Sequence, residues 1–270
     1  MPEDVSHLTA DWPGTHALAV AKANRVLAAA GDLDAEYRIA SITKLFTCYA
    51  ALIALEEGTI ELDDEAGPAG STVRHLMAHA SGLGFNEHRQ LAPAGERRIY
   101  SNTGIEALAT HIEIYAGMAF DHYLFEGVLE PLGLTDIDPS GSPAHGLHMS
   151  LRSLLVFANE LLAPTLIAPS TLAMATTPTW PELRGVLPGF GAMDQNLWGL
   201  GFEIRGTKDP HWTAPLASPA TFGHFGGAGS FLWVDPDRGL VGATVGDVEF
   251  GDWAVEAWAP ANAALLERYG

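Results

Sequence analysis

The segment Tyr37-Arg-Ile-Ala-Ser-Ile-Thr-Lys-Leu-Phe46 decides how the chain can fold, because it leads into the clearest helical pattern in the sequence. Apolar residues recur at helical spacing over residues 41–57, and Gly58 supplies a stop. Ser41 and Lys44 lie three positions apart at the start of this helix. They can be an ordinary N-cap and a solvated first-turn lysine. A cation in the first turn is slightly unfavourable, however, which favours a chemical role.

Strand patterns occur near both ends of the chain. Residues 15–30 predict a β-hairpin that turns near Lys22–Asn24. Four further strands are predicted at Trp198–Arg205, Thr221–Phe225, Gly229–Val234 and Leu240–Val245. Arg238-Gly239 predicts the turn between the last two strands, and residues 252–268 predict an amphipathic C-terminal helix. Distant parts of the chain are therefore expected to complete one sheet.

Helical patterns fill the middle of the chain. The predicted helices cover residues 71–80, 103–117, 119–130, 150–162 and 169–176. Ser71 suits the N-cap of the first of these, and Thr103 with Glu106 predicts a capping box for the second. Residues 59–70 are expected to form a loop. Residues 178–195, rich in proline and glycine, are expected to be a linker or a flap.

These elements predict an α/β fold of the α+β type. An antiparallel sheet is expected, flanked by N- and C-terminal helices, with an inserted all-helical lobe. The predicted sheet domain consists of residues 1–58 together with 196–270, and the predicted helical lobe covers residues 59–195. A chain of 270 residues is long enough to bury a sizeable core in this arrangement.

Composition argues against several classes of function. The net charge is −19 and no basic cluster exceeds the pair Arg97-Arg98, so nucleic acid and anionic membranes would be repelled. The longest apolar stretch, Leu45–Leu55, is too short to span a bilayer. Residues 1–14 lack the features of a secretory signal, which predicts a cytoplasmic protein. The lone cysteine, Cys48, excludes an intramolecular disulfide and is expected to be a small core residue.

Ser41 and Lys44 can form an activated nucleophile. Positions three apart share a helix face, so the amine can reach the hydroxyl. The free N–H groups and positive dipole end of a helix start favour a serine that becomes an alkoxide. Lys44 must be neutral to accept a proton, and this requires burial or a nearby cation that lowers its pKa.

Two further segments carry side chains suited to the same chemistry. Tyr100-Ser101-Asn102 combines a phenol that can relay protons with an amide that can hold both a lysine amine and a substrate carbonyl. His224-Phe225-Gly226-Gly227 lies on a predicted strand, where Gly226 lets substrate lie along the strand edge. The N–H of Gly227 can complete an oxyanion hole with the N–H of Ser41. Taken alone, either segment also fits an ordinary turn.

Together, the three segments resemble the serine penicillin-recognising enzymes: β-lactamases, DD-peptidases and related esterases. Ser41-Ile-Thr-Lys44 matches their S-x-x-K element. Tyr100-Ser101-Asn102 is similar to the Tyr-x-Asn form of the class C branch, and His224-Phe225-Gly226 to the H-x-G of esterase-like members. The resemblance covers most of residues 35–250 and extends to His75–Leu83, Leu129–Leu134 and Gly223–Ser230.

The resemblance implies a role for each of these residues. Ser41 is implied to be the nucleophile, Lys44 its partner in proton transfer, and Tyr100 the general base and acid. Asn102 is implied to orient Lys44 and the acyl substrate. His224 stands where the family places a lysine that receives a substrate carboxylate, and a neutral imidazole holds a carboxylate less firmly. We therefore expect a serine esterase or amidase that forms an acyl-enzyme on a small substrate, with no cofactor and no metal.

Several alternatives stay open. A β-lactamase or a DD-peptidase-type penicillin-binding protein would use the same residues on a β-lactam or peptide. A non-catalytic ligand-binding protein that retains the fold belongs to another class. His75 and His79 can ligate a metal, but they lack the glutamate of H-E-x-x-H. No serine lies in G-x-S-x-G, which argues against an α/β-hydrolase. No P-loop occurs, which argues against a nucleotide site of that type. The sequence predicts no oligomeric state.

Overall fold

The computed structural model describes residues 1–270, which form two compact units. The first unit contains three parts of the chain: Met1–Ile42, His148–Pro164 and Ile204–Gly270. The second unit contains two parts: Thr43–Leu147 and Thr165–Glu203. Each unit therefore combines segments that lie far apart in the sequence.

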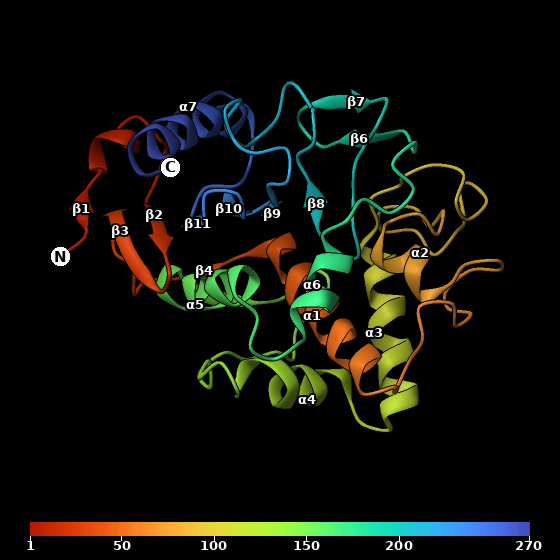
Figure 1. The fold of residues 1–270 in the computed structure, drawn as a ribbon. Helices are drawn as coiled ribbons and strands as arrows, with labels where there is room; N and C mark the ends of the chain where they lie inside the picture. Colours follow the sequence, from red (N-terminus) through yellow and green to blue (C-terminus); the bar gives the residue numbers. More distant parts are fainter. The chain divides into compact units, whose positions relative to one another are not determined.

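A seven-stranded sheet belongs to the first unit (Figure 1). Its strands, in spatial order, are β1 (Glu3–Asp4), β3 (Arg25–Ala30), β2 (His16–Lys22), β11 (Leu240–Gly246), β10 (Ser230–Asp235), β9 (Phe222–Gly226) and β8 (Glu203–Ile204). β1 pairs with β3 in parallel, whereas the β3–β2, β2–β11, β11–β10 and β10–β9 pairs are antiparallel. The predicted fold class, with a sheet built from both ends of the chain, is confirmed.

The first hairpin is fixed by its turn. Lys22 pairs with Arg25, and the two residues between them, Ala23 and Asn24, have positive φ angles of 48° and 62°. Two consecutive residues in the left-handed region form a turn whose twist matches that of the flanking strands. The hairpin predicted for residues 15–30 is therefore confirmed.

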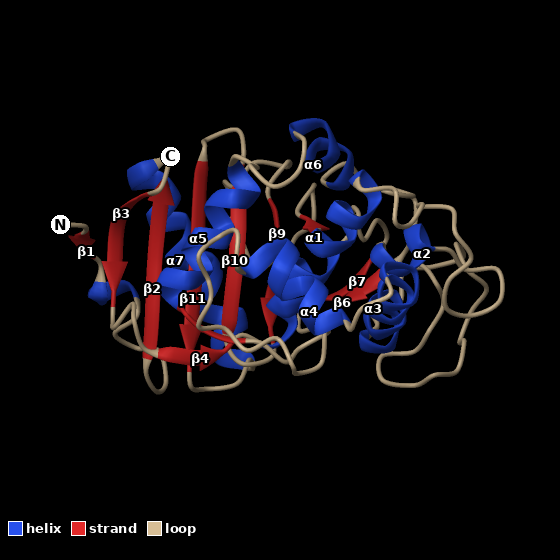
Figure 2. Ribbon diagram, turned by 90° about the horizontal axis from the view of Figure 1, so that it is seen from below, coloured by secondary structure: helices blue, strands red, loops and turns tan.

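Helices cover both faces of this sheet (Figures 1 and 2). α7 (Asp252–Tyr269) packs on one face, where Trp233 Nε1 donates a 2.9 Å hydrogen bond to Asn262 Oδ1. α5 (Leu151–Leu162) lies on the other face, against β2, β10 and β11. Coverage on both sides explains why every residue of β10 and β11 is buried.

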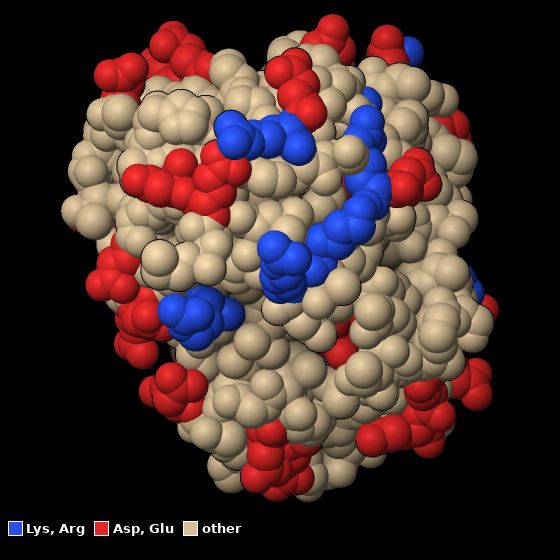
Figure 3. Space-filling model, turned by 60° about the vertical axis from the view of Figure 1, so that its left-hand side comes forward, with Lys and Arg blue, Asp and Glu red and all other residues tan.

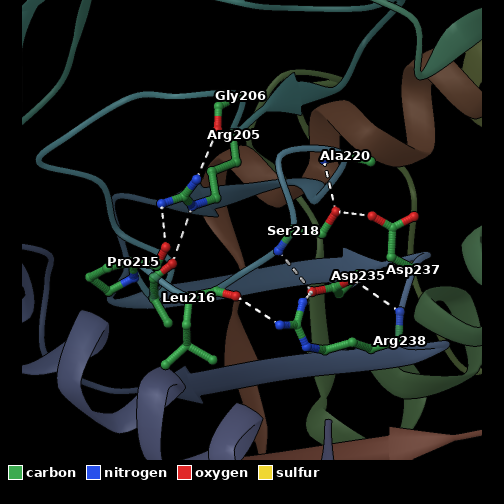
Figure 4. A network of polar contacts seen from close by, with 10 residues as sticks. Arg205, Gly206, Pro215, Leu216, Ser218, Ala220, Asp235, Asp237 and Arg238 are labelled. Atoms are coloured by element: carbon green, nitrogen blue, oxygen red, sulfur yellow. Dashed lines mark hydrogen bonds and ion pairs between the residues drawn. The ribbon is translucent and has the colours of Figure 1, made fainter.

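A polar network orders the long connection between β8 and β9 (Figure 4). The Arg205 guanidinium donates hydrogen bonds to three backbone carbonyls of this connection. Arg238 forms an ion pair with Asp235 at 2.9 Å, and both side chains also bind the backbone of residues 216–218. The connection is thereby tied to the end of β10, which fixes the entry into the strand that carries His224.

Four short elements complete the first unit. They are the 3-10 helices η1 (Ser6–Leu8) and η2 (Ala40–Ile42) and the antiparallel strands β4 (Glu36–Arg38) and β5 (His148–Ser150). The β4–β5 ribbon was not predicted, because three residues are too few to reveal a strand period.

The second unit is mainly helical. Its elements are α1 (Thr43–Glu56), α2 (Val73–Met77), α3 (Asn102–Ala116), α4 (Phe120–Leu124), the π-helical turn η3 (Phe125–Leu129), α6 (Pro169–Ala175) and the hairpin strands β6 (Gly185–Leu187) and β7 (Gly191–Met193). α1 contacts α3, α4 and α6, and its residues from Thr43 to Ala54 are all buried. α1 is therefore the central helix of this unit, which accounts for apolar residues on all its sides.

The predicted helix caps are wrong at two positions. Thr72 and not Ser71 is the N-cap of α2, which ends early because His79 adopts a left-handed φ of 52°. Ser101 caps α3 in place of the capping box predicted at Thr103. The Thr103 hydroxyl donates to Gly84 O instead, so a tertiary contact replaces the local one.

The region before β9 also differs from its prediction. Residues 178–195 contain the β6–β7 hairpin, and the predicted strand Trp198–Arg205 is reduced to Glu203–Ile204. Gly201 interrupts the extended backbone with a φ of 95°. A Cβ atom at this position would lie 2.2 Å from Cys48 Cβ, so the close approach to α1 requires glycine.

The boundaries between the two units differ from the predicted domain boundaries, which lie after residue 58 and after residue 195. α1 belongs with the helices that it contacts in the second unit, and α5 belongs with the sheet that it covers in the first. A helix that is apolar on all sides, such as α1, carries no sequence signal for the partner against which it packs.

The surface carries charges of both signs. On the face drawn in Figure 3, Asp and Glu side chains form several separate groups, and Lys and Arg side chains lie among them. Some of the basic residues are paired, for example Arg152 with Asp34 at 2.6 Å. None of the helices combines the length and the apolar character that crossing a bilayer requires.

Candidate active site

Lys44 is the centre of a buried polar cluster in the second unit. It lies in the first turn of α1, and its side chain is fully buried. Its Nζ donates hydrogen bonds to Asn102 Oδ1 at 2.6 Å and to Ala144 O at 2.8 Å. The same atom lies 4.8 Å from the centroid of the Tyr100 ring. Three predicted site residues, from two separate segments of the chain, therefore meet at this amine.

Burial changes the chemistry of the Lys44 amine. Loss of solvation lowers its pKa from 10.5 to about 7, and the interactions with Cys48 and Glu106, which raise the pKa, offset this only in part. Burial therefore brings the pKa of the amine close to neutral pH, where the neutral form is accessible. A neutral amine can accept a proton, which an ordinary surface lysine cannot do at this pH.

Aromatic side chains surround Tyr100 and fix its ring. The ring centroids of His79, Phe85 and Trp198 lie 4.7, 5.8 and 6.0 Å from that of Tyr100. His79 Nδ1 also accepts a hydrogen bond from Ser101 N at 3.3 Å, which holds the backbone next to the tyrosine. The phenol is therefore held in one orientation, as a group must be that transfers protons along a defined path.

Asn102 begins α3 and uses both ends of its amide. Its Oδ1 accepts the hydrogen bond from Lys44, and its Nδ2 donates to Asn86 Oδ1 at 2.8 Å. Its backbone N donates to Phe85 O at 2.7 Å. The loop that contains Phe85 and Asn86 therefore sets the orientation of the amide, and the amide in turn holds the lysine amine.

The loop of residues 142–147 presents the Ala144 carbonyl to the lysine amine. Thr43 and Thr47, both on α1, form hydrogen bonds with the backbone of this loop at 3.1 and 2.6 Å. Glu106, on α3, accepts a further hydrogen bond from the loop at 3.0 Å. Because the same helix carries the amine and anchors the loop, donor and acceptor are positioned together.

Ser41 lies at the end of the first unit, in η2, which α1 follows directly. The preceding residue, Ala40, has a φ of 46°, a left-handed conformation that is unfavourable for a residue other than glycine. Ser230 Oγ donates a 2.9 Å hydrogen bond to Ile39 O, which fixes this segment. The serine and the buried lysine therefore lie in two elements, η2 and α1, that follow each other directly along the chain.

β9 contacts η2 within the first unit. A Cβ atom on Gly226 would lie 2.3 Å from Ile39 O, so only glycine permits this approach. The sequence predicts Gly227 on the strand, but the structure has it in the turn that follows β9. His224 is buried on β9, with its Nδ1 at hydrogen-bond distance from Phe225 O. Ser41, His224 and both glycines are thus residues of the first unit.

Two contacts of the cluster are not predicted by the sequence. Ala144 contributes only its backbone carbonyl, which has no signature in a sequence. His79 was weighed as a metal ligand together with His75, yet its ring packs against Tyr100. The His75 ring instead stacks on Trp180 with the centroids 4.5 Å apart. The recognised segment His75–Leu83 was the signal that could have placed His79 near the site.

Cys48 lies one turn after Lys44 on α1 and is fully buried. Burial raises the pKa of its thiol to about 12, so the thiolate that a nucleophile requires does not form near neutral pH. The predicted role of Cys48 as a small core residue is confirmed.

The chain belongs to the beta-lactamase family, whose model matches residues 9–140 and 136–265. The crystal structure of a beta-lactamase from Mycobacterium bovis is 44% identical, with a TM-score of 0.95 over 97% of this chain and 98% of that chain. A mutant of simvastatin synthase from Aspergillus terreus has the same fold, with a TM-score of 0.78 and 17% identity over 98% and 93% of the two chains. The predicted membership of the serine penicillin-recognising enzymes is thereby confirmed.

Curated relatives match shorter parts of the chain. Monacolin J acid methylbutanoyltransferase from Aspergillus terreus is 27% identical over 159 residues, which cover 39% of this chain and 38% of that protein. The D-alanyl-D-alanine-carboxypeptidase/endopeptidase AmpH of Escherichia coli is 27% identical over 149 residues, or 42% and 39%. The matches therefore span less than half of these relatives. Members of the family are serine hydrolases or acyltransferases.

Ser101→Ala is expected to lower the free energy of unfolding by about 1–2 kcal/mol. Ser101 Oγ is buried, accepts a 2.9 Å hydrogen bond from Gly104 N and donates one to Gly84 O at 2.7 Å. The substitution removes the α3 cap and leaves two buried backbone groups without this partner. Urea denaturation followed by circular dichroism measures the change.

Ser150→Ala is the matched control, because Ser150 caps α5 by accepting a 3.1 Å hydrogen bond from Ser153 N. Both variants are expected to lose stability. Only Ser101→Ala changes the residue between Tyr100 and Asn102, so only this variant is expected to lower kcat/KM. A loss of kcat/KM that is equal in both variants would contradict this role of the α3 cap.

Proposed function

We propose that the protein is a serine hydrolase that forms an acyl-enzyme at Ser41 and acts on a small ester or amide. The observation that carries the proposal is the buried Lys44 amine, which has a pKa of about 7 and lies bound to Asn102 beside the Tyr100 ring. Burying an amine costs free energy that an apolar side chain of similar size would not. A protein that only retained the fold would have no need of this arrangement.

In the proposed reaction, the neutral Lys44 amine accepts the hydroxyl proton as Ser41 Oγ bonds to the substrate carbonyl carbon. Tyr100 donates its proton to the leaving oxygen or nitrogen as that bond breaks, and Lys44 then returns a proton to Tyr100. The N–H groups of Ser41 and Gly227 bind the carbonyl oxygen, and Asn102 orients the substrate. Water then attacks the acyl-enzyme by the reverse route, which releases the acid and restores Ser41.

The names of the relatives support acyl chemistry. One is a methylbutanoyltransferase and another a D-alanyl-D-alanine carboxypeptidase. Transfer of an acyl group and cleavage of a peptide both require attack on a carbonyl carbon. A serine acyl-enzyme supports either reaction. The molecule that takes the acyl group from the serine, water or another nucleophile, decides between hydrolysis and transfer.

The alternative is a β-lactamase or DD-peptidase, which the relative from Mycobacterium bovis supports. In the family that this chain resembles, a lysine binds the substrate carboxylate at the position of His224. The imidazole of His224 is buried, and a neutral ring offers a carboxylate no ion pair. A neutral ester loses nothing by this replacement, so esters are the preferred substrate class.

p-Nitrophenyl acetate is expected to be hydrolysed with a higher kcat/KM than nitrocefin, by a factor of about 10–100. The factor corresponds to one missing charge-assisted hydrogen bond to the carboxylate. Ser41→Ala is the control and is expected to abolish both activities. A higher kcat/KM for nitrocefin would make β-lactamase the better assignment. Turnover of neither substrate by the folded protein would favour a ligand-binding protein.

A further inference from the structure

A large open cavity borders Tyr100 within the second unit. Its volume is about 980 Å³, and its walls are the loop around Phe85, residues 96–100 and the β6–β7 hairpin. Sites for small organic molecules commonly have volumes of about 300–1,000 Å³. Because Lys44 Nζ lies 4.8 Å from the Tyr100 ring, the cavity begins beside the proposed proton-transfer groups.

Large apolar side chains are exposed in this cavity. Phe85, Leu91 and Val186 all line it, and they are 49%, 39% and 61% exposed. Apolar side chains that share one hollow surface gain free energy when an apolar group displaces the water on them. The lining therefore favours a ligand that is apolar over much of its surface.

The charged residues of the lining balance one another. They comprise three arginines and three acids: Arg97, Arg98, Arg184, Glu96, Glu182 and Asp194. Arg184 lies 3.7 Å from Asp194. The buried Arg98 guanidinium donates its hydrogen bonds to backbone carbonyls, which leaves it little capacity for a ligand. The cavity therefore favours neither an anion nor a cation, and a neutral group fits it best.

The walls of the cavity are held by backbone hydrogen bonds. Arg98 N donates to Arg184 O at 2.8 Å, and Asn196 N donates to Leu183 O at 2.9 Å, which fixes the start of the β6–β7 hairpin. On the opposite wall, Leu91 N donates to Gly82 O at 2.7 Å. The apolar surface is therefore formed before any ligand binds.

We propose that this cavity receives an alkyl or aryl group of the substrate, so that the substrate is a neutral ester or amide with an apolar chain longer than acetyl. The inference rests on the proposed function for the position of the reacting bond. An acetyl group leaves the cavity empty, whereas each methylene that enters it raises kcat/KM by up to about fourfold.

A chain-length series tests the inference. We expect kcat/KM to rise at least about tenfold from p-nitrophenyl acetate to p-nitrophenyl octanoate if the acyl group enters the cavity. A comparable rise from ethyl acetate to octyl acetate would assign the cavity to the alcohol group instead. Val186→Asp places a carboxylate on the cavity wall and is expected to remove the rise. Val156→Asp, at an exposed valine on α5, is the matched control and is expected to retain the rise.

A binding measurement separates this inference from the proposed function. The neutral apolar probe N-phenyl-1-naphthylamine is titrated by fluorescence into Ser41→Ala, which needs no catalysis. Adding Val186→Asp is expected to raise the Kd about tenfold, and adding Val156→Asp is expected to leave it unchanged. If Val186→Asp weakens probe binding but the wild-type protein hydrolyses none of the esters, the apolar site is supported and the hydrolase is contradicted. A flat chain-length series with equal Kd values in both variants would overturn the inference.

Discussion

Lys44→Met is expected to lower kcat/KM for p-nitrophenyl acetate by a factor of about 10²–10⁴, the range for loss of a positioned proton-transfer group. Methionine is similar to lysine in length and suits a buried apolar site, so α1 is expected to remain folded. The amine that binds Asn102 and the Ala144 carbonyl is then absent. Steady-state kinetics on the purified variant measure the loss.

Lys208→Met is the control for this substitution, because Lys208 is also buried but donates to the backbone carbonyl of Ile204 in the first unit. It removes a second lysine amine that is also buried and hydrogen-bonded to a backbone carbonyl. We expect Lys208→Met to retain ester turnover. If Lys44→Met kept a near-native rate, Lys44 would have no part in the mechanism.

The same amine is expected to set the pH dependence of the wild-type enzyme. The neutral form accepts the proton, and burial lowers the pKa of Lys44 from 10.5 to about 7. kcat/KM should therefore rise as the pH passes through about 7 and level off above it. Stability gives an independent readout: between about pH 7 and 10.5 the Lys44 amine binds its proton in the unfolded chain but not in the folded one. The stability of the wild type relative to Lys44→Met should therefore increase across that window.

Tyr100→Phe is expected to lower kcat/KM by a factor of about a hundred or more. Phenylalanine keeps the ring that packs against His79 and Phe85, so the change removes the hydroxyl alone. The loss should be greater for an ethyl ester than for a p-nitrophenyl ester, because a poor leaving group depends more on protonation. Kinetics on both esters measure this difference.

Tyr115→Phe is the matched control, because Tyr115 is an exposed tyrosine near the end of α3. It is expected to behave like the wild type on both esters. An equal loss on both esters in Tyr100→Phe would indicate a positional role for the hydroxyl and not a proton transfer to the leaving group.

Much of the cluster could be predicted from the sequence, because its side chains come in short segments with fixed spacing. Ser41 and Lys44 lie three positions apart at the predicted helix start, and the structure has them in η2 and α1, which follow each other directly along the chain. The pairing of Asn102 with Lys44, expected from the resemblance, is present at 2.6 Å. The roles that the resemblance implies for these residues stay predictions.

Other features depend on packing that no local pattern reveals. The Ala144 carbonyl reaches the amine because Thr43 and Thr47 on α1 anchor its loop, and this contact joins residues about a hundred positions apart. Likewise, Gly201 breaks a predicted strand because the backbone must pass Cys48 closely. Tertiary contacts of this kind override the local preference for strand.

The central claim is that Ser41 attacks an acyl carbon because a buried amine and a fixed phenol move its proton. Intact-protein mass spectrometry with peptide mapping, after incubation with an alkyl fluorophosphonate, tests it most directly. We predict a single adduct on Ser41 in the folded wild type, with labelling strongly slowed in Lys44→Met. Absence of an adduct on the folded protein, or an adduct on a different residue, would contradict the account.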